Sequence, residues 1–152
     1  MGLHFRHLGA NVEDQQFLRA NPAEIPNAID ELMRAYGAVT TFRTCKKEIE
    51  IAGVRFLPGD KVAMSTTLAG RDPAEFDDPA AVRLNRRPRH VGFGFGIHTC
   101  AGMHLARREL RIAMEEFLAR IPDFRIAPGH TVNYHLGMIQ PVALPLVWNP
   151  AG

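Results

Sequence analysis

The sequence predicts a mainly α-helical fold with small β-sheets, and three observations support this prediction. Residues 21–36 and 101–120 carry apolar side chains at the three- and four-residue spacing of amphipathic helices. Residues 49–64 alternate apolar and polar side chains around glycine turns, which is typical of short strands. Residues 71–89 combine prolines with many charges, which indicates an irregular surface segment.

The composition is that of an ordinary folded domain. Of the 152 residues, 46% are hydrophobic and 22% are charged, a balance that argues against a disordered chain. The net charge of +2 is too small to favour nucleic acid as a partner. Cys45 and Cys100 cannot form a disulfide framework, and no apolar run approaches the roughly 18 residues of a membrane span. We therefore expect a cytoplasmic protein with no nucleic-acid or membrane partner.

Helices are expected along most of the chain. Residues 1–9 look like the end of a helix, so we expect the chain to open within one. A short helix is predicted at residues 14–20, and a stronger one at residues 21–36, with a proline in its first turn and Gly37 as its cap. The helix at residues 101–120 should bury a stripe and expose its charges. The stripe is Leu110, Ala113, Phe117 and Ile121, and the charges are Arg107, Arg108, Arg111, Glu115 and Glu116.

Short strands are expected in two parts of the chain. The alternating apolar residues of the first part are Ile49, Ile51, Val54, Phe56, Val62 and Met64. Near the end, residues 131–148 hold Pro145 within a run of valines and leucines. Because proline cannot donate a ladder hydrogen bond, we expect edge strands there.

A glycine-rich loop at residues 93–102 ends in a single cysteine. Its glycines let the backbone adopt positive φ and approach a flat ligand closely. Cys100 is expected where the following helix begins, and a helix N-terminus stabilises a thiolate. Backbone N–H groups of such a loop can also hydrogen-bond the sulfur. This is the chemistry that a haem-thiolate iron requires.

Three other interpretations of the loop are open from the residues alone. Cys100 could be a buried structural cysteine beside a tight turn. Gly94 and Gly96 could begin a dinucleotide-binding loop, although Thr99 stands where its third glycine belongs. His98, Cys100 and His104 could hold a metal ion, although structural zinc usually takes four ligands.

The loop resembles the haem-binding loop of the cytochrome P-450 family, Phe-x-x-Gly-x-x-x-Cys-x-Gly, and adds the Gly and His typical of its soluble bacterial branch. The matching residues are Phe93, Gly94, Gly96, His98, Cys100 and Gly102. The resemblance implies that these residues bind haem b, iron protoporphyrin IX. It makes Cys100 both the iron ligand and the catalytic residue.

A second motif lies upstream of the loop. Glu31 and Arg34 have the i,i+3 spacing of a helical ion pair, which by itself is common on protein surfaces. The resemblance implies a buried structural pair near the haem. An arginine that completes this network in the family falls on Ala81 in an ungapped alignment, and Arg83 or Arg86 could replace it.

The resemblance assigns further residues to the cofactor and the substrate. Arg43 stands where the family has an arginine that binds a haem propionate, and His98 resembles a loop histidine that does the same. Taken alone, they could be a solvated strand arginine and a loop-stabilising histidine. Val39, Met138 and Ile139 resemble substrate-pocket positions.

The resemblance covers essentially the whole chain and is strongest to enzymes of the camphor-hydroxylase type. It implies that residues 1–152 are the C-terminal haem-binding portion of a cytochrome P-450 fold. The N-terminal portion, which carries the family's oxygen-activating acid–alcohol pair, is then absent from this truncated chain.

The implied function is that of a haem-thiolate monooxygenase. It would hydroxylate a small apolar substrate, such as a terpenoid, using O2 and two electrons from a ferredoxin-type partner. Arg107, Arg108 and Arg111 could offer that partner positive charge, or could simply form a solvated helix face. The alternative is a truncated, non-catalytic remnant that binds haem weakly or not at all.

Overall fold

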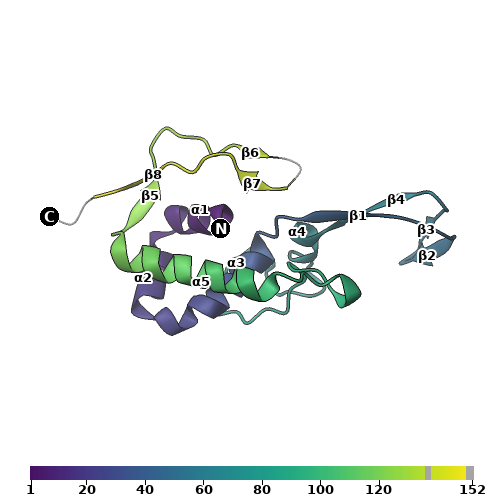
Figure 1. Cartoon of the computed structure of the whole chain (residues 1–152), viewed down its shortest axis with the longest axis horizontal. Coiled ribbons are helices and arrows are strands. Elements are labelled where there is room, and N and C mark those ends of the chain that lie inside the picture. The colour runs from purple at the N-terminus through teal and green to yellow at the C-terminus, as the bar shows by residue number, and fades with distance from the viewer. Residues whose placement is uncertain (136–137, 150–152) are drawn as a thin grey trace.

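A computed structural model describes residues 1–135 and 138–149, and Figure 1 shows their arrangement. The helices are α1 (Gly2–Ala10), α2 (Val12–Ala20), η1 (Pro22–Glu24), α3 (Ile25–Ala35), α4 (Thr66–Ala69), η2 (Gly96–His98) and α5 (Met103–Arg120). The strands are β1 (Thr40–Thr44), β2 (Ile49–Ile51), β3 (Val54–Phe56), β4 (Lys61–Ser65), β5 (Phe124–Ile126), β6 (Tyr134–His135), β7 (Gln140–Pro141) and β8 (Leu146–Trp148). No helix of the described part is both long and apolar enough to cross a membrane.

The helices confirm the predicted positions and correct their details. The helix predicted at residues 21–36 is divided into the 3-10 turn η1 and the α-helix α3, with Pro26 in the first turn of α3. Helix α5 begins at Met103, two residues later than predicted. Its buried positions are Leu110, Met114 and Leu118, so the predicted stripe through Ala113 is rotated relative to the observed one.

Gly37 was expected to cap α3, but the structure gives this glycine a different reason. The cap residue is Tyr36, and Gly37 is not among the glycines with positive φ. A Cβ on Gly37 would lie 2.7 Å from the hydroxyl oxygen of Thr66. Position 37 therefore requires a glycine because the start of α4 packs directly against its backbone. This contact fixes the path of the chain into β1.

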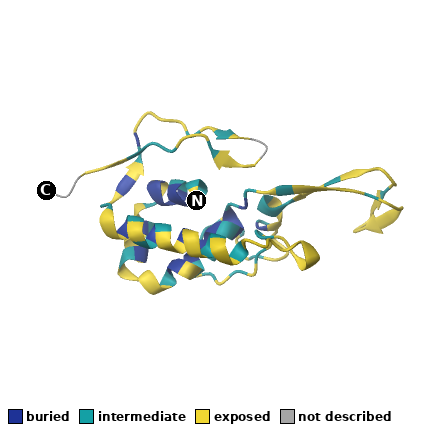
Figure 2. Ribbon diagram, in the orientation of Figure 1, coloured by how far each residue is buried: buried dark blue, intermediate teal, exposed yellow. Residues whose placement is uncertain are grey.

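The strands form four separate antiparallel pairs: β1 with β4, β2 with β3, β5 with β8, and β6 with β7. In Figure 1, β1 and β4 extend from the helical body as an arm, and the β2–β3 hairpin forms its tip. The arm is largely exposed, as Figure 2 shows. The edge strands predicted near the end are β6, β7 and β8, and residues 136–137 lie outside the described part.

The hydrophobic core lies where α1, α2, α3 and α5 meet β5 (Figure 2). Phe5, Phe117 and Phe124 form an aromatic cluster between α1, α5 and β5, with ring centroids 4.7 Å apart for Phe5 and Phe117. Such edge-to-face contacts add to the stabilisation from area burial. The core fixes α3 against α5, and these two helices flank the cysteine loop.

Candidate functional site

The cysteine loop has the backbone geometry that its glycines were expected to allow. Gly94 and Gly96 have φ of +76° and +65°, a region that other residues rarely adopt. A Cβ on Gly94 would lie 3.1 Å from the carbonyl oxygen of His98, so the loop is also too tight for a side chain there. The N–H of Cys100 donates to the carbonyl of Phe93 at 2.8 Å and closes the loop.

Cys100 is exposed, which excludes the interpretation of a buried structural cysteine. It lies three residues before Met103, the first residue of α5, and Gly102 is the N-cap. Helix α5 therefore begins three residues after the cysteine, and not at the cysteine itself. The carbonyl of Cys100 accepts the N–H of Met103 at 3.2 Å, so the ligand position is still tied to the start of α5.

Two adjoining cavities open beside this loop. A cavity of 380 Å³ is bordered by α1, the end of α3, β1 and the loop, and its lining includes Tyr36, Val39 and Cys100. A second cavity of 460 Å³ lies toward the arm and is lined by Arg43 and Phe95. Both share Thr66, Gly94 and His98. Together they form a cleft between the loop and the β1–α4 segment, and Cys100 lines the smaller of the two cavities.

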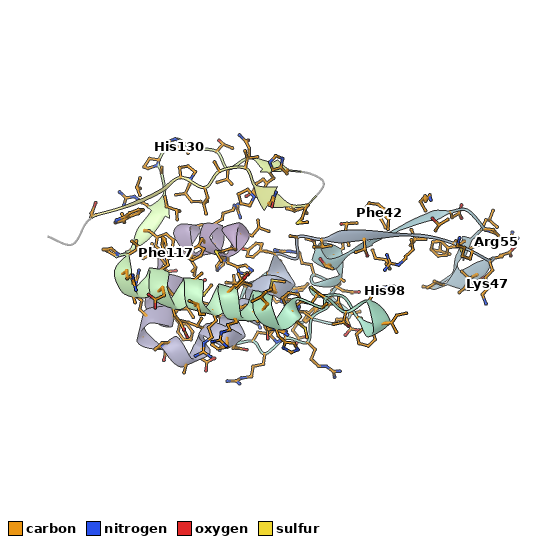
Figure 3. All side chains as sticks on the ribbon, viewed as in Figure 1. Phe42, Lys47, Arg55, His98, Phe117 and His130 are labelled. Atoms are coloured by element: carbon orange, nitrogen blue, oxygen red, sulfur yellow. The ribbon has the colours of Figure 1, made fainter. Side chains whose placement is uncertain are left out.

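The structure brings Arg43 and His98 to the same part of this cleft. Arg43 lies on β1 and is exposed, with one guanidinium nitrogen bonded only to the carbonyl of Phe42. His98 lies on the opposite wall, and Figure 3 shows it on the loop near the base of the arm. Two nitrogen-bearing side chains thus line the second cavity, where they could bind carboxylates.

The substrate-pocket candidates are only partly brought together. Val39 lines the cavity that also contains Cys100. Met138 and Ile139 do not line it, although the N–H of Ile139 donates to the carbonyl of Ala38 at 3.0 Å. The turn that carries them therefore lies against the segment preceding β1.

Glu31 and Arg34 form a fully buried ion pair on α3. Two nitrogens of Arg34 each donate to the Glu31 carboxylate at 2.8 Å, and neither side chain is exposed. Arg34 also donates to the carbonyls of Gly70, Pro79 and Ala81. The pair thus fastens the irregular segment 71–89 to α3.

The structure identifies Arg86 as the third member of this network. Its Nε donates to Glu31 at 3.1 Å. Arg83 contributes only its backbone N–H, at 2.9 Å from the same oxygen, and its side chain pairs with exposed Asp78. Ala81 contributes a carbonyl to Arg34. The arginine was hard to place in sequence because the segment has no regular register.

A second polar cluster near the loop was missed from sequence. Asp30 accepts hydrogen bonds from Arg107 at 2.9 Å and from His90 at 3.3 Å. Burial alone would raise the pKa of the Asp30 carboxyl, but the bonds from His90 and Arg107, with their charges, hold that pKa below its usual value. Arg107 was predicted to face solvent, whereas its side chain is 36% exposed and paired.

His4 contributes an unusual buried imidazole to the smaller cavity. Among the described residues, its Nδ1 is the one buried side-chain nitrogen or oxygen without a hydrogen-bond partner. Burial, together with the positive charges of the N-terminus and His7, lowers the pKa of His4 to about 3. His4 is therefore neutral at physiological pH.

Comparison with known proteins decides the family. The model of the family described as "Cytochrome P450" matches residues 24–136. The chain belongs to the cytochrome P450 family. Its members are haem-containing monooxygenases, and the iron of their haem b is the redox centre.

Relatives and solved structures agree with this assignment. The chain is 42% identical to the "Probable cytochrome P450 127A1" of Sinorhizobium fredii, over 91% of this chain and 34% of that protein. It is 38% identical to the nocardicin C N-oxygenase of Nocardia uniformis, over 86% of this chain and 35% of that protein. The chain thus spans about a third of the length of the curated relatives it matches.

The crystal structure of cytochrome P450 CYP101C1 is similar, with a TM-score of 0.90 and 38% identity over 97% of this chain and 39% of that chain. This confirms the predicted fold class, a mainly helical part of the P450 fold with small β-sheets.

The residues around Cys100 fit the family's cofactor. Cys100 offers an exposed sulfur donor, the loop leaves a space that a side chain at Gly94 would fill, and Arg43 and His98 carry donors for carboxylates. Among the described residues, no three His, Cys, Asp or Glu side chains gather as a metal ion would need.

Proposed function

We propose that this chain is the haem-thiolate portion of a cytochrome P450 monooxygenase, with Cys100 as the iron ligand. One observation carries the proposal: the exposed Cys100 thiol lies at the end of a glycine loop and opens onto a 380 Å³ cavity. Residues 1–152 would form the C-terminal haem-binding portion of the domain. The family membership makes haem b the cofactor.

The roles of the loop residues follow from their positions. When bound, the haem supplies the chemistry that activates O2 with two electrons and inserts one oxygen atom into the substrate. Cys100 would donate electron density from its thiolate, which favours O–O cleavage. Phe93, Gly94, Gly96 and Gly102 would hold the loop close to the cofactor.

Arg43 and His98 would orient the cofactor from the two walls of the cleft, because both line the 460 Å³ cavity and carry donors for its carboxylates. The buried pair of Glu31 and Arg34 would keep the segment before the loop in place. Neither Glu31 nor Arg34 lines the described cavities, so their role would be structural.

The substrate would be a small apolar molecule, such as a terpenoid. The cavity beside Cys100 is lined by Leu3, Met33 and Val39, which favour an apolar ligand. Met138 and Ile139 would extend this wall, because their turn is hydrogen-bonded to Ala38. The Nocardia relative is named as an N-oxygenase, which is compatible with an oxygen-inserting reaction in this family.

A ferredoxin-type protein would supply the electrons in the cytoplasm. The surface beside the loop carries Arg108 and Arg111, both exposed, next to a 610 Å³ cleft between α3 and α5. Exposed arginines of this kind steer an acidic partner toward its docking site. Arg107 and Arg111 would contribute less charge than Arg108, since they are paired with Asp30 and Glu115.

A non-catalytic remnant that binds haem weakly is the second candidate. It is favoured by the large exposure of apolar residues on the loop, where Phe95 is 85% and Ile97 is 98% exposed. A loop so open on one side would hold a cofactor less firmly than a closed pocket. Haem affinity and turnover of the purified chain separate the two candidates.

The test of the proposal is the reduced, carbon-monoxide-bound absorption spectrum of the haem-loaded protein. The Cys100→Ser variant should lose the thiolate-type spectrum, because a hydroxyl is a poor anionic ligand at neutral pH. Cys45→Ser is the matched control and should keep that spectrum, since Cys45 lies outside the cleft and its thiol bonds the carbonyl of Lys47. An unchanged thiolate spectrum in Cys100→Ser would remove this residue from the role.

A further inference from the structure

Asp30, His90 and Arg107 connect three parts of the molecule at one point. Asp30 lies on α3, His90 on the segment before the cysteine loop, and Arg107 on α5. A single oxygen of Asp30 accepts from Nε2 of His90 at 3.3 Å and from Nε of Arg107 at 2.9 Å. The carboxylate therefore holds the two segments that flank the loop at a fixed separation.

His90 is constrained on both of its ring nitrogens. Its Nδ1 accepts the backbone N–H of Gly92 at 3.0 Å, so its Nε2 carries the hydrogen that Asp30 accepts. The side chain is only 3% exposed. Gly92 is also close-packed, because a Cβ there would lie 2.9 Å from the same Nδ1. His90 thus fixes the backbone at Gly92, directly before the loop begins at Phe93.

The cluster reaches Cys100 through Phe93. The guanidinium carbon of Arg107 lies 5.1 Å from the centroid of the Phe93 ring. The centroids of the His90 and Phe93 rings are 6.0 Å apart. The carbonyl of Phe93 accepts the N–H of Cys100 at 2.8 Å. A shift of Phe93 would therefore move the acceptor that fixes the cysteine backbone.

An ordinary surface ion pair would not have these properties. The exposed pair of Arg111 and Glu115 lies one turn further along α5 and contacts neither the loop nor α3 through hydrogen bonds. By contrast, the Asp30 cluster joins residues 60 and 77 positions apart in sequence. Its lowered Asp30 pKa agrees with a carboxylate kept ionised by its two donors.

We propose that Asp30, His90 and Arg107 are positioning residues that hold Phe93, and through it the Cys100 backbone, in the geometry needed for thiolate ligation of the haem iron. The inference rests on the proposed function, because it assumes that Cys100 is the ligand. It adds a second anchor for the loop, separate from the network of Glu31, Arg34 and Arg86.

The experiment compares variants of the haem-loaded protein, each under conditions where it stays folded, in two measurements that report on the iron site. These are the fraction of thiolate-type spectrum with carbon monoxide and the midpoint potential of the iron. Asp30→Ala and Arg107→Ala should each lower the ratio of thiolate-type to other forms roughly fivefold, the factor that corresponds to an ion pair of about 1 kcal/mol. Both should also shift the midpoint potential.

Conservative and control variants complete the design. Asp30→Glu should restore part of the thiolate-type fraction, because it keeps the carboxylate. Glu115→Ala removes a neighbouring charge without touching the cluster and should leave both measurements unchanged. If Asp30→Ala does not fold, Asp30→Asn and Arg107→Lys replace it, and hydrogen exchange of the Cys100 N–H should then be faster than in the unmodified protein.

The possible outcomes separate this inference from the proposed function. Loss of the thiolate spectrum in Cys100→Ser, with an unchanged spectrum and potential in the Asp30 and Arg107 variants, would overturn the inference and leave the function in place. The inference would also be overturned, and the function left in place, if the Asp30 and Arg107 variants lowered only the melting temperature. A thiolate spectrum that survives in Cys100→Ser would overturn the function itself.

Discussion

The Glu31 carboxylate accepts hydrogen bonds from three side-chain nitrogens and one backbone N–H, and its side chain is fully buried. A buried carboxylate is tolerated only when its oxygens are satisfied in this way. The i,i+3 spacing with Arg34 could be predicted from sequence, because it is local. The contribution of Arg86 could not, because it joins residues 55 positions apart through a segment without regular structure.

Glu31→Ala should reduce the free energy of unfolding by about 3–5 kcal/mol, because it leaves the buried Arg34 guanidinium without its carboxylate. Glu48→Ala is the control, since Glu48 and Arg55 form a pair with both side chains more than half exposed. It should cost about 1 kcal/mol or less. Urea unfolding of both variants measures the difference. Equally small losses of unfolding free energy would show that the Glu31 pair contributes no more than an exposed ion pair.

His4 makes the stability of the protein depend on pH. Its pKa is about 3 in the folded state against an ordinary value of 6.5, so the unfolded chain binds the proton more strongly. Stability is therefore complete above about pH 6.5 and falls as the pH drops below it. At about pH 5.5 the loss from this group should be about 1.4 kcal/mol.

The variant His4→Phe keeps an aromatic ring but removes the titrating group, so this part of the acid destabilisation should disappear. His130→Phe, at an exposed position, should retain it. Urea unfolding at about pH 7.5 and about pH 5.5 provides the comparison. The same pH dependence in His4→Phe as in the unmodified protein would contradict the assignment.

At the scale of elements, Gln15 joins α1, α2 and β5. Its buried amide nitrogen donates to the carbonyls of Leu8 and Phe124 at 2.7 Å, and its oxygen accepts the N–H of Phe124 at 3.2 Å. The amide thus satisfies the end of α1 and the start of β5 at once. This contact joins residues 109 positions apart, so no local sequence pattern predicted it.

Gln15→Leu should lower the free energy of unfolding by at least about 2 kcal/mol, because the N–H and carbonyl of Phe124 lose their partner in a buried setting. The adjacent Gln16 is exposed and bonds only the side chain of Asp123. Gln16→Leu should change stability by no more than about 0.5 kcal/mol. Thermal unfolding followed by circular dichroism should show a clear difference between the two variants.

The elements themselves were predictable where the pattern is local. The apolar periodicity of α3 and the alternation of β2, β3 and β4 are present within single windows of sequence. The pairing of β1 with β4 and of β5 with β8 joins distant segments and needed the structure. The stripe on α5 was rotated because Met114 and Leu118, and not Ala113, face α3 and the β5 region.

At the scale of the whole molecule, the cysteine loop could be predicted from sequence and its surroundings could not. The residues of the loop are contiguous, so the motif and its resemblance to a haem-binding loop are visible in a single window of sequence. The cleft over Cys100, in contrast, is built by α1, α3, β1 and α4, which are far apart in sequence. The Asp30 cluster was missed for the same reason.

The last prediction concerns what the 152-residue chain can do by itself. Apolar side chains are exposed on β1, α4 and the loop, where Phe42 is 66%, Leu68 is 74% and Ile97 is 98% exposed. The chain spans about a third of the length of its relatives, so a closed pocket would need the remaining two thirds. Water would have free access to the iron, and exposed apolar surface promotes self-association.

We therefore expect the isolated chain to associate in solution and to show no turnover of apolar compounds with haem, O2 and an electron donor supplied. Co-expression with the matching N-terminal portion of a relative should restore a monomeric complex and turnover. Light scattering and product analysis by mass spectrometry measure the two properties. Turnover by the chain alone would refute the prediction, because it would show that the cleft between the loop and the β1–α4 segment excludes water well enough to protect the reaction without the part of the domain that only the relatives carry.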